Sequence, residues 1–382
     1  MKLRLLKFDT INPEIYLQKK INENPELIRG MDRKELLEWI ISLRSNFSDF
    51  YTFYLNKHGW EAEEFFITDT YLQKTAEELY GKKINFLKTQ DKLKDLIHPV
   101  KGRRKLNIIS DYIEHYKPDV ILVREQTGIP SELWKYSSKH SLIVSRLAAP
   151  MPYKWAPSDF DLILTSTEVY KNFFEINNVR SIINDNGFDV RILQELVQST
   201  KKYDATFVGG IGNRFWKKRT NLIEAISEMD NFKWWGYNGD VYPKEHQITK
   251  KWQGITSGID MLQIYKDSKI VLNDYGEVAH GEGVNQRIFE VMGVGTLLLT
   301  RESETLTKKY PQNIFVTFTD IEDCKNKIRY YLENENEREE IARRGQNFIL
   351  ENYNYHSLMK ILSENLKESY YRKFEPEHNL KI

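Results

Sequence analysis

The chain has little cysteine, little net charge and no long apolar run. Among its 382 residues only Cys324 is a cysteine, so no internal disulfide can form and a reducing compartment is expected. The formal net charge of +1 excludes a strong overall attraction to nucleic acid or to an acidic membrane. No stretch approaches the roughly 20 apolar residues of a membrane span, and the first residues lack the apolar core of a signal peptide. We therefore expect a soluble, cytoplasmic protein.

Short apolar runs alternate with longer amphipathic segments along the chain. Several of the runs are apolar throughout, which is typical of parallel strands covered on both faces by helices. The expected strands are 3–8, 119–123, 141–145, 161–166, 205–210, 233–237, 269–274, 296–300 and 313–318. Helical patterns are found at 105–117, 166–177, 219–229, 257–268 and 323–353. This alternation predicts an α/β fold with parallel sheets joined by right-handed crossovers.

The alternation is interrupted by a linker-like stretch at 188–203, after which it restarts with a new strand at about residue 205. Two doubly wound domains are expected, with ligands beyond the carboxyl ends of the strands. Their expected bounds are 1–195 for the first domain, 196–350 for the second, and 351–382 for a C-terminal helix that returns to the first. Residues 11–80 are expected to be a helical elaboration, either a structural cap or an acceptor-binding element.

Two glutamates lie eight positions apart in a glycine-flanked segment, HGEGVNQRIFEVMGVGTLLLT, at residues 280–300. Glu282 lies in a loop-like stretch between two glycines, and Glu290 falls within an apolar helical run. A loop followed by a helix N-terminus suits a nucleotide diphosphate, because backbone N–H groups and the helix dipole favour phosphate oxygens. A carboxylate one turn inside the helix can accept hydrogen bonds from ribose hydroxyls. Glutamates are also common in first helical turns for reasons of the dipole alone.

A second candidate segment opens the second domain, YDATFVGGIGNRFWKKRTNLIEAI. The strand ends in a glycine-rich turn, where the backbone can approach a ligand closely. Basic side chains follow just before a helix, and such groups can neutralise a diphosphate. The residues of this candidate diphosphate site are Gly209, Gly210, Gly212, Arg214, Lys217, Lys218 and Arg219.

With these two segments the second domain resembles the C-terminal half of a glycosyltransferase of the GT-B fold. Glu282 and Glu290 match the E-x7-E pattern of its retaining group, and VGG…R…KKR is similar to its phosphate-binding loop. The string GVNQRIFEVMGVGTLLLT more closely resembles the CgeB-like, spore-maturation-protein-like glycosyltransferases, within the glycosyl transferases group 1 family. The resemblance covers residues 105–370 well and the first hundred loosely. It implies two Rossmann-like domains facing each other across a cleft.

The resemblance also implies roles for individual residues. Glu290 would hold the donor ribose, and Glu282 with the backbone of 283–285 would approach the donor sugar and phosphates. Arg214, together with either Lys218 or Arg219, would neutralise the diphosphate. Tyr237 lies where the nucleotide base usually binds, either stacking on it or packing in the core. Further residues in or near the matching motif are His280, Gly283, Val284, Asn285 and Arg287; of these, His280 could instead cap a loop and Arg287 could be a structural ion-pair partner.

The implied reaction is transfer of a glycosyl group from a nucleotide-diphosphate sugar to a hydroxyl of a glycan, a glycolipid or a protein. Fixed positive groups aimed at the leaving phosphate would supply much of the catalysis, so neither a metal nor another cofactor is expected. An inverting enzyme would need a base, for which Glu125 and Asp9 follow predicted strands. The E-x7-E pattern favours retention of configuration instead.

Two rival functions stay open. A sugar-nucleotide epimerase shares the double-domain fold but uses no acceptor. A non-catalytic nucleotide-sugar-binding subunit would agree with two departures from the family pattern: no glycine follows the first strand, and Arg146 stands near the place where many retaining members carry a histidine. No nucleic-acid partner is expected, and the basic run at 101–105 allows at most peripheral membrane contact.

Overall fold

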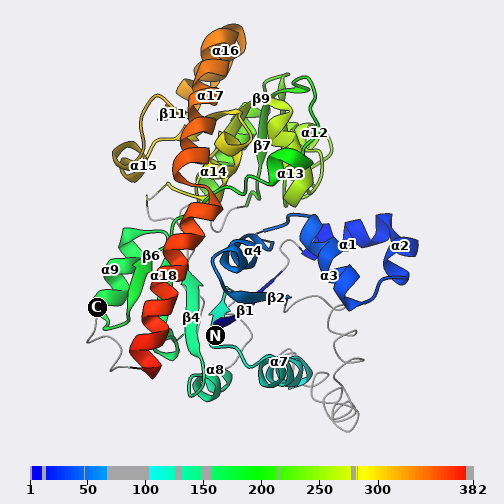
Figure 1. Cartoon of the computed structure of the whole chain (residues 1–382). Helices are drawn as coiled ribbons and strands as arrows, with labels where there is room; N and C mark the ends of the chain where they lie inside the picture. Colours follow the sequence, from blue (N-terminus) through cyan, green and yellow to red (C-terminus); the bar gives the residue numbers. More distant parts are fainter. Residues whose placement is uncertain are drawn as a thin grey trace. The chain divides into compact units, whose positions relative to one another are not determined.

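The computed structural model describes residues 2–10, 14–46, 48–66, 103–124, 131–147, 156–212, 216–276, 281 and 283–375. For residues 33, 103–108, 111, 131, 132 and 136, which lie in helices, it describes the backbone alone. The chain forms two compact units (Figure 1). Unit 1 comprises Met1–Asp185 and Leu358–Ile382, and unit 2 comprises Asn186–Ser357. The expected boundary at 195–196 therefore lies inside unit 2.

Unit 1 is built on a six-stranded sheet in the order β2-β1-β3-β4-β5-β6, and every pairing in it is parallel. The strands are β1 (Arg4–Asp9), β2 (Glu61–Phe66), β3 (Val120–Val123), β4 (Leu142–Leu147), β5 (Leu162–Thr165) and β6 (Ser181–Ile183). The helices are α1 (Glu14–Glu23), α2 (Pro25–Arg29), α3 (Arg33–Ser42), α4 (Phe50–Lys57), α7 (Arg103–Tyr116), α8 (Ser131–Ser137), the 3₁₀ turn η1 (Pro157–Asp159) and α9 (Glu168–Ile176).

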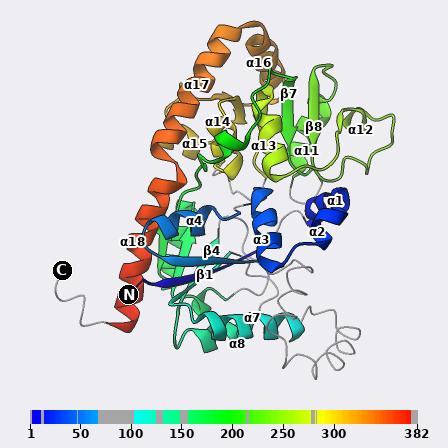
Figure 2. The same ribbon diagram turned by 45° about the vertical axis from the view of Figure 1, so that its right-hand side comes forward.

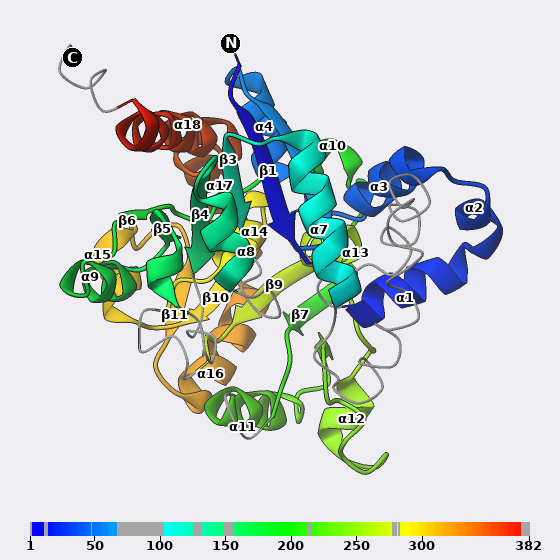
Figure 3. The same cartoon turned by 90° about the horizontal axis from the view of Figure 1, so that it is seen from below.

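The main core of unit 1 lies between the sheet and helices α7, α8 and α9. Figure 3 shows α7 and α8 side by side along the strands, and Tyr112 of α7 and Trp134 of α8 belong to the same apolar cluster as Phe8 of β1. Helices α1, α2 and α3 form a smaller group with a core of its own, which includes Tyr16 and Leu36 (Figure 1). This group follows the carboxyl end of β1, within the predicted elaboration at 11–80. That range also contains α4 and strand β2.

Unit 2 is built on a five-stranded parallel sheet in the order β11-β10-β9-β7-β8. The strands are β7 (Tyr203–Val208), β8 (Phe232–Trp235), β9 (Ser268–Asn273), β10 (Leu297–Arg301) and β11 (Val316–Phe318). The helices are α10 (Ile192–Glu195), α11 (Lys217–Ile226), α12 (Gln247–Lys251), α13 (Gly258–Lys266), α14 (Gln286–Gly293), α15 (Glu304–Lys309), α16 (Ile321–Glu333) and α17 (Glu335–Asn352). Figure 2 shows β7 and β8 next to each other at one side of this sheet.

The last helix, α18 (Tyr355–Phe374), begins in unit 2 and continues into unit 1 from Leu358. Helix α17 ends at Asn352 and α18 begins at Tyr355, within the range 351–382 in which a C-terminal helix was expected. The side chain of Asn354 accepts a hydrogen bond from the N–H of Ser357 at 2.9 Å, as an N-cap does. Within unit 1 the Trp60 indole donates to Ser363 at 2.8 Å in a buried contact.

Candidate functional site

The topology of unit 2 identifies the place where a ligand can bind. Strand β7 leads to β8 on one side, and the chain then crosses to β9 on the other side of β7. In doubly wound sheets such a reversal of strand order opens a crevice at the carboxyl ends of the two strands concerned. Here those ends are Val208 of β7 and Asn273 of β9. Both predicted segments lead from this edge.

The turn after β7 brings two backbone segments into direct contact. Gly236 follows β8, and a Cβ built on it would lie 2.0 Å from the carbonyl oxygen of Gly209. The N–H of Gly209 donates to the carbonyl of Trp235 at 2.8 Å, which fixes the approach. A Cβ on Gly210 would lie 3.4 Å from the Tyr237 ring. Because glycine has no Cβ, these residues allow the turn after β7 to pack closely against the segment after β8, and they leave the strand ends uncovered by side chains of the turn.

Helix α14 begins at the same edge. Its N-cap residue, Asn285, makes no capping bond with its side chain; instead the Asn285 amide donates to the Asn273 side chain at 2.9 Å. The buried Oδ1 atom of Asn285 has no hydrogen-bond partner in the described part of the chain. The preceding Gly283 has φ +69°, and a Cβ there would lie 2.2 Å from the hydroxyl of Ser303. Uncapped N–H groups and the helix dipole make this terminus suitable for an anion.

Of the predicted basic residues, the structure brings Arg219 to the edge. Its guanidinium donates to the carbonyl of Gly210 at 3.1 Å and to that of Asp274 at 2.7 Å. The side chain is buried, whereas Lys218 is exposed on α11. Of the two residues between which the sequence left the choice open, Arg219 is the one that contacts this edge, and its role in neutralising a diphosphate stays a prediction. Gly212, at the end of the same turn, bonds through its N–H to Thr220 at 2.9 Å.

Arg287 and Glu290 occupy the same face of α14, one turn apart. Arg287 donates to the Asn273 side chain at 2.7 Å and to the carbonyl of Val208. No described residue donates a hydrogen bond to the Glu290 carboxylate or forms an ion pair with it. Burial raises the pKa of Glu290 to about 7, and the positive charge of Arg287 opposes that rise. A carboxylate without a hydrogen-bond or ion-pair partner among the described residues can accept bonds from vicinal hydroxyls.

Tyr237 and Val284 lie at the margin of this edge. Tyr237 is partly exposed after β8, and burial of its ring raises the pKa of its hydroxyl. Val284 is half-buried directly before α14. Four predicted site residues, Glu125, Arg214, His280 and Glu282, lie outside the described residues.

Two polar residues after the apolar part of β9, Asn273 and Asp274, were not among the predicted site residues. Asn273 is fully buried and joins Asn285 and Arg287 to Thr300, to which it donates at 2.9 Å. Asp274 forms a two-bond ion pair with Arg301 at 2.9 and 3.0 Å. The signal was present, because an otherwise apolar strand ending in Asn-Asp indicates a functional strand end.

Asp9, predicted as a candidate base, lies in unit 1 at the end of β1. It is buried, and its carboxylate is 3.1 Å from the ammonium of Lys7 and 3.2 Å from the guanidinium of Arg124. Lys7 also binds Glu64 at 2.9 Å, within a buried charge network. This arrangement identifies Asp9 as an ion-pair partner; its role as a base stays a prediction.

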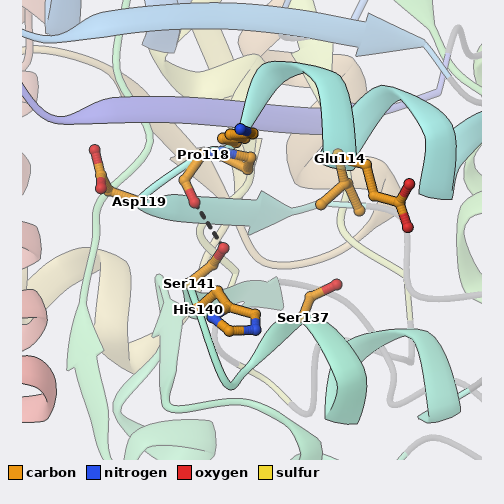
Figure 4. Close-up of a pocket in the computed structure, with 8 residues that line it drawn as sticks. Glu114, Pro118, Asp119, Ser137, His140 and Ser141 are labelled. Atoms are coloured by element: carbon orange, nitrogen blue, oxygen red, sulfur yellow. Dashed lines mark hydrogen bonds between the residues drawn. The ribbon is translucent and has the colours of Figure 1, made fainter.

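Unit 1 also has a cavity of about 500 Å³, shown in Figure 4. It lies at the amino-terminal starts of β3 and β4, between the ends of α7 and α8. Asp119, Ser141 and His140 are among its lining residues, and the hydroxyl of Ser141 donates to the carbonyl of Pro118 at 2.6 Å. The cavity is at the opposite edge of its sheet from the carboxyl ends of the strands.

Neither a metal site nor a membrane span is found in the described ranges. There, no group of three or more His, Cys, Asp or Glu side chains is arranged to hold a metal ion. None of the described helices is both long and apolar enough to cross a membrane. A cytoplasmic location stays a prediction of the sequence.

Comparison with known proteins shows similarity to glycosyltransferases. A family model described as glycosyl transferase-like matches residues 217–364. The structure of HepE from Anabaena in complex with UDP-glucose is similar, with a TM-score of 0.57, 14% identity, and 96% of this chain and 100% of that chain covered. Sucrose-phosphate synthase from Thermosynechococcus elongatus gives a TM-score of 0.57 at 9% identity, with 96% and 99% covered. A search of curated proteins finds no match.

A glycosyltransferase from Rickettsia africae is also similar, with a TM-score of 0.56 at 14% identity, and 98% and 99% of the two chains covered. At these identities the likeness shows the fold, and the two doubly wound units confirm the predicted GT-B architecture. The glycosyl transferase-like family model matches residues 217–364, which is most of unit 2 and the first part of α18 in unit 1. The family match begins with α11, directly after the glycine-rich turn, and contains all of α14. The narrower resemblance to CgeB-like enzymes stays a prediction.

Proposed function

We propose that the chain transfers a sugar from a UDP-sugar to a hydroxyl acceptor, and that unit 2 holds the donor at the ends of β7 and β9. The observation that carries this proposal is the Glu290 carboxylate, which has no partner among the described residues and lies one turn inside a helix without a side-chain cap. The structure of HepE with UDP-glucose supports the choice of donor.

In this proposal the donor spans three parts of the edge. Glu290 accepts hydrogen bonds from the ribose hydroxyls. The backbone of Gly209 and Gly210 and the start of α14 face the diphosphate, whose charge is balanced by the nearby Arg219 guanidinium. Tyr237 borders the place of the base. The positive groups stabilise the leaving UDP as the bond to the sugar breaks, so that no metal ion is required.

The acceptor is a hydroxyl of a glycan, a lipid-linked sugar or a protein, and the E-x7-E spacing favours retention of configuration. Two outcomes separate transfer from the rival functions. An epimerase would convert the UDP-sugar without an acceptor, whereas a binding subunit would hold it without turnover across acceptor pools. A transferase releases UDP at a rate that rises when its acceptor is added.

Calorimetry of UDP-glucose binding tests the donor site. Glu290→Gln is expected to weaken binding by about 1–3 kcal/mol, the scale of lost hydrogen bonds to a charged group. Glu351→Gln, a neutral change of an exposed carboxylate on α17, serves as the matched control and should bind as the parent does. Equal affinities for Glu290→Gln and the parent would remove Glu290 from the site. Binding lost on addition of EDTA would contradict metal independence.

A further inference from the structure

The guanidinium of Arg287 is bound to uncharged oxygens from three different elements. It donates to the Asn273 side chain of β9 at 2.7 Å, to the Tyr265 hydroxyl of α13 at 3.3 Å, and to the carbonyl of Val208 at the end of β7. The guanidinium also lies 5.0 Å from the centre of the Phe207 ring. A Cβ on Gly209 would lie 2.8 Å from an Arg287 nitrogen, so the glycine turn rests directly on this side chain.

No carboxylate neutralises Arg287 in an ion pair among the described residues. The nearest acidic group on its own helix is Glu290, which lies at the i+3 position, where side chains of a helix are neighbours. Charge-assisted bonds to three neutral acceptors hold the cation in place without cancelling its field. The positive charge of Arg287 therefore acts on Glu290, the one carboxylate of α14.

We infer that Arg287 is a positioning residue of the donor site, which fixes α14 on the ends of β7 and β9 and holds a positive charge one turn from Glu290. This inference rests on the proposed function, because it assigns Arg287 to a site that binds a UDP-sugar. It differs from the sequence-based expectation that Arg287 contacts the donor or belongs to a structural ion pair.

The ionisable groups around Glu290 are few. Arg287 lies on the same helix, and Tyr265 comes from α13. Helix α14 also packs on β9, β10 and α17. Within the described ranges, none of these three elements places a charged group against Glu290. Burial raises the pKa of Glu290 to about 7 even with the opposing charge of Arg287 in place. Removal of that charge must raise the pKa further.

The sign of the pH effect follows from the form of Glu290 that binds. Only the carboxylate accepts from both ribose hydroxyls, so affinity for UDP-glucose is expected to rise as the pH passes through about 7. At a pH one unit below the pKa about a tenth of the sites are ionised, and binding is about tenfold weaker than at its plateau. The diphosphate of UDP-glucose is capped by the sugar and does not titrate in this range.

The experiment is calorimetric titration of the full chain with UDP-glucose between roughly pH 5.5 and pH 8.5, a range that extends to both sides of the Glu290 pKa of about 7. Arg287→Gln should move the midpoint of the affinity profile upward by about one unit or more. Arg287→Lys keeps the charge and should leave the midpoint near that of the parent, even where affinity falls. Arg338→Gln removes another buried arginine, on α17, and should not move the midpoint.

The outcomes are distinct. An Arg287→Gln midpoint equal to that of the parent, with affinity lowered uniformly, would overturn the inference and leave a purely structural role. A midpoint that shifts as far in Arg287→Lys as in Arg287→Gln would overturn it too, and this comparison remains if the glutamine variant folds poorly. Failure of the parent to bind UDP-glucose at any pH would instead refute the proposed function.

Discussion

The close backbone contact between Gly236 and Gly209 allows a sharp test of how the candidate donor site is built. In Gly236→Ala the new Cβ would lie 2.0 Å from the Gly209 carbonyl oxygen and 2.5 Å from its carbonyl carbon. Both are backbone atoms, so no side chain can rotate away and the turn after β7 must move. Gly254 supplies a matched control, since it also has positive φ, +96°, but no atom lies within 4 Å of its would-be Cβ.

The two substitutions share the conformational penalty of alanine at positive φ, on the order of 1–2 kcal/mol. Gly236→Ala adds overpacking, which costs typically about 1–3 kcal/mol more. We expect its free energy of unfolding to fall below that of Gly254→Ala by this difference. Its affinity for UDP-glucose should fall at least about tenfold, the equivalent of roughly 1.4 kcal/mol.

Urea denaturation combined with amide hydrogen exchange of β7 and β8 measures the first effect, and calorimetry measures the second. The exchange data separate unit 2 from unit 1, which a single unfolding curve does not. Equal stability and equal affinity in Gly236→Ala and Gly254→Ala would refute the view that close backbone approach at Gly209 shapes the site.

Two further predictions concern unit 1. Burial raises the pKa of Glu64 from 4.5 to about 7, so the folded state holds the proton more tightly than the unfolded chain does. The unfolding free energy of the parent relative to that of Glu64→Gln should therefore decline as the pH rises from about 4.5 to about 7. A difference in unfolding free energy that does not change with pH would contradict this prediction. Ser363→Ala removes the acceptor of the buried Trp60 indole and should lower the unfolding free energy by about 1–3 kcal/mol, with Ser357→Ala on the same helix as control. A null effect in denaturation experiments would show that this bond does not anchor α18.

Sequence pattern predicted the central strands well, because central parallel strands are buried on both faces. All nine expected runs correspond to observed strands within a few residues; the last, expected at 313–318, begins at Val316. The two strands that were missed, β2 and β6, are the edges of their sheet. Strand β2 reads EAEEFF, in which Glu64 faces Lys7 of β1 directly across the ladder. A strand whose buried position holds an ion-pair partner such as Glu64 does not form an apolar run in the sequence.

The candidate site was predictable where short-range patterns specify it. The glycine turn after β7 and the tip of α14 were both assigned from sequence, because glycine spacing and helix periodicity are local features. The contacts of Asn273 and Arg287 were not, since they join residues 14 positions apart through the sheet. Only the tertiary structure shows that Arg219, rather than Lys218, reaches the strand ends.

A crystal structure of the chain with UDP-glucose tests the central claim most directly. We predict that the diphosphate lies against the Gly209–Gly210 turn and the start of α14, with both ribose hydroxyls within hydrogen-bonding distance of Glu290. A donor bound elsewhere, with the Glu290 carboxylate still without a ligand, would contradict the claim.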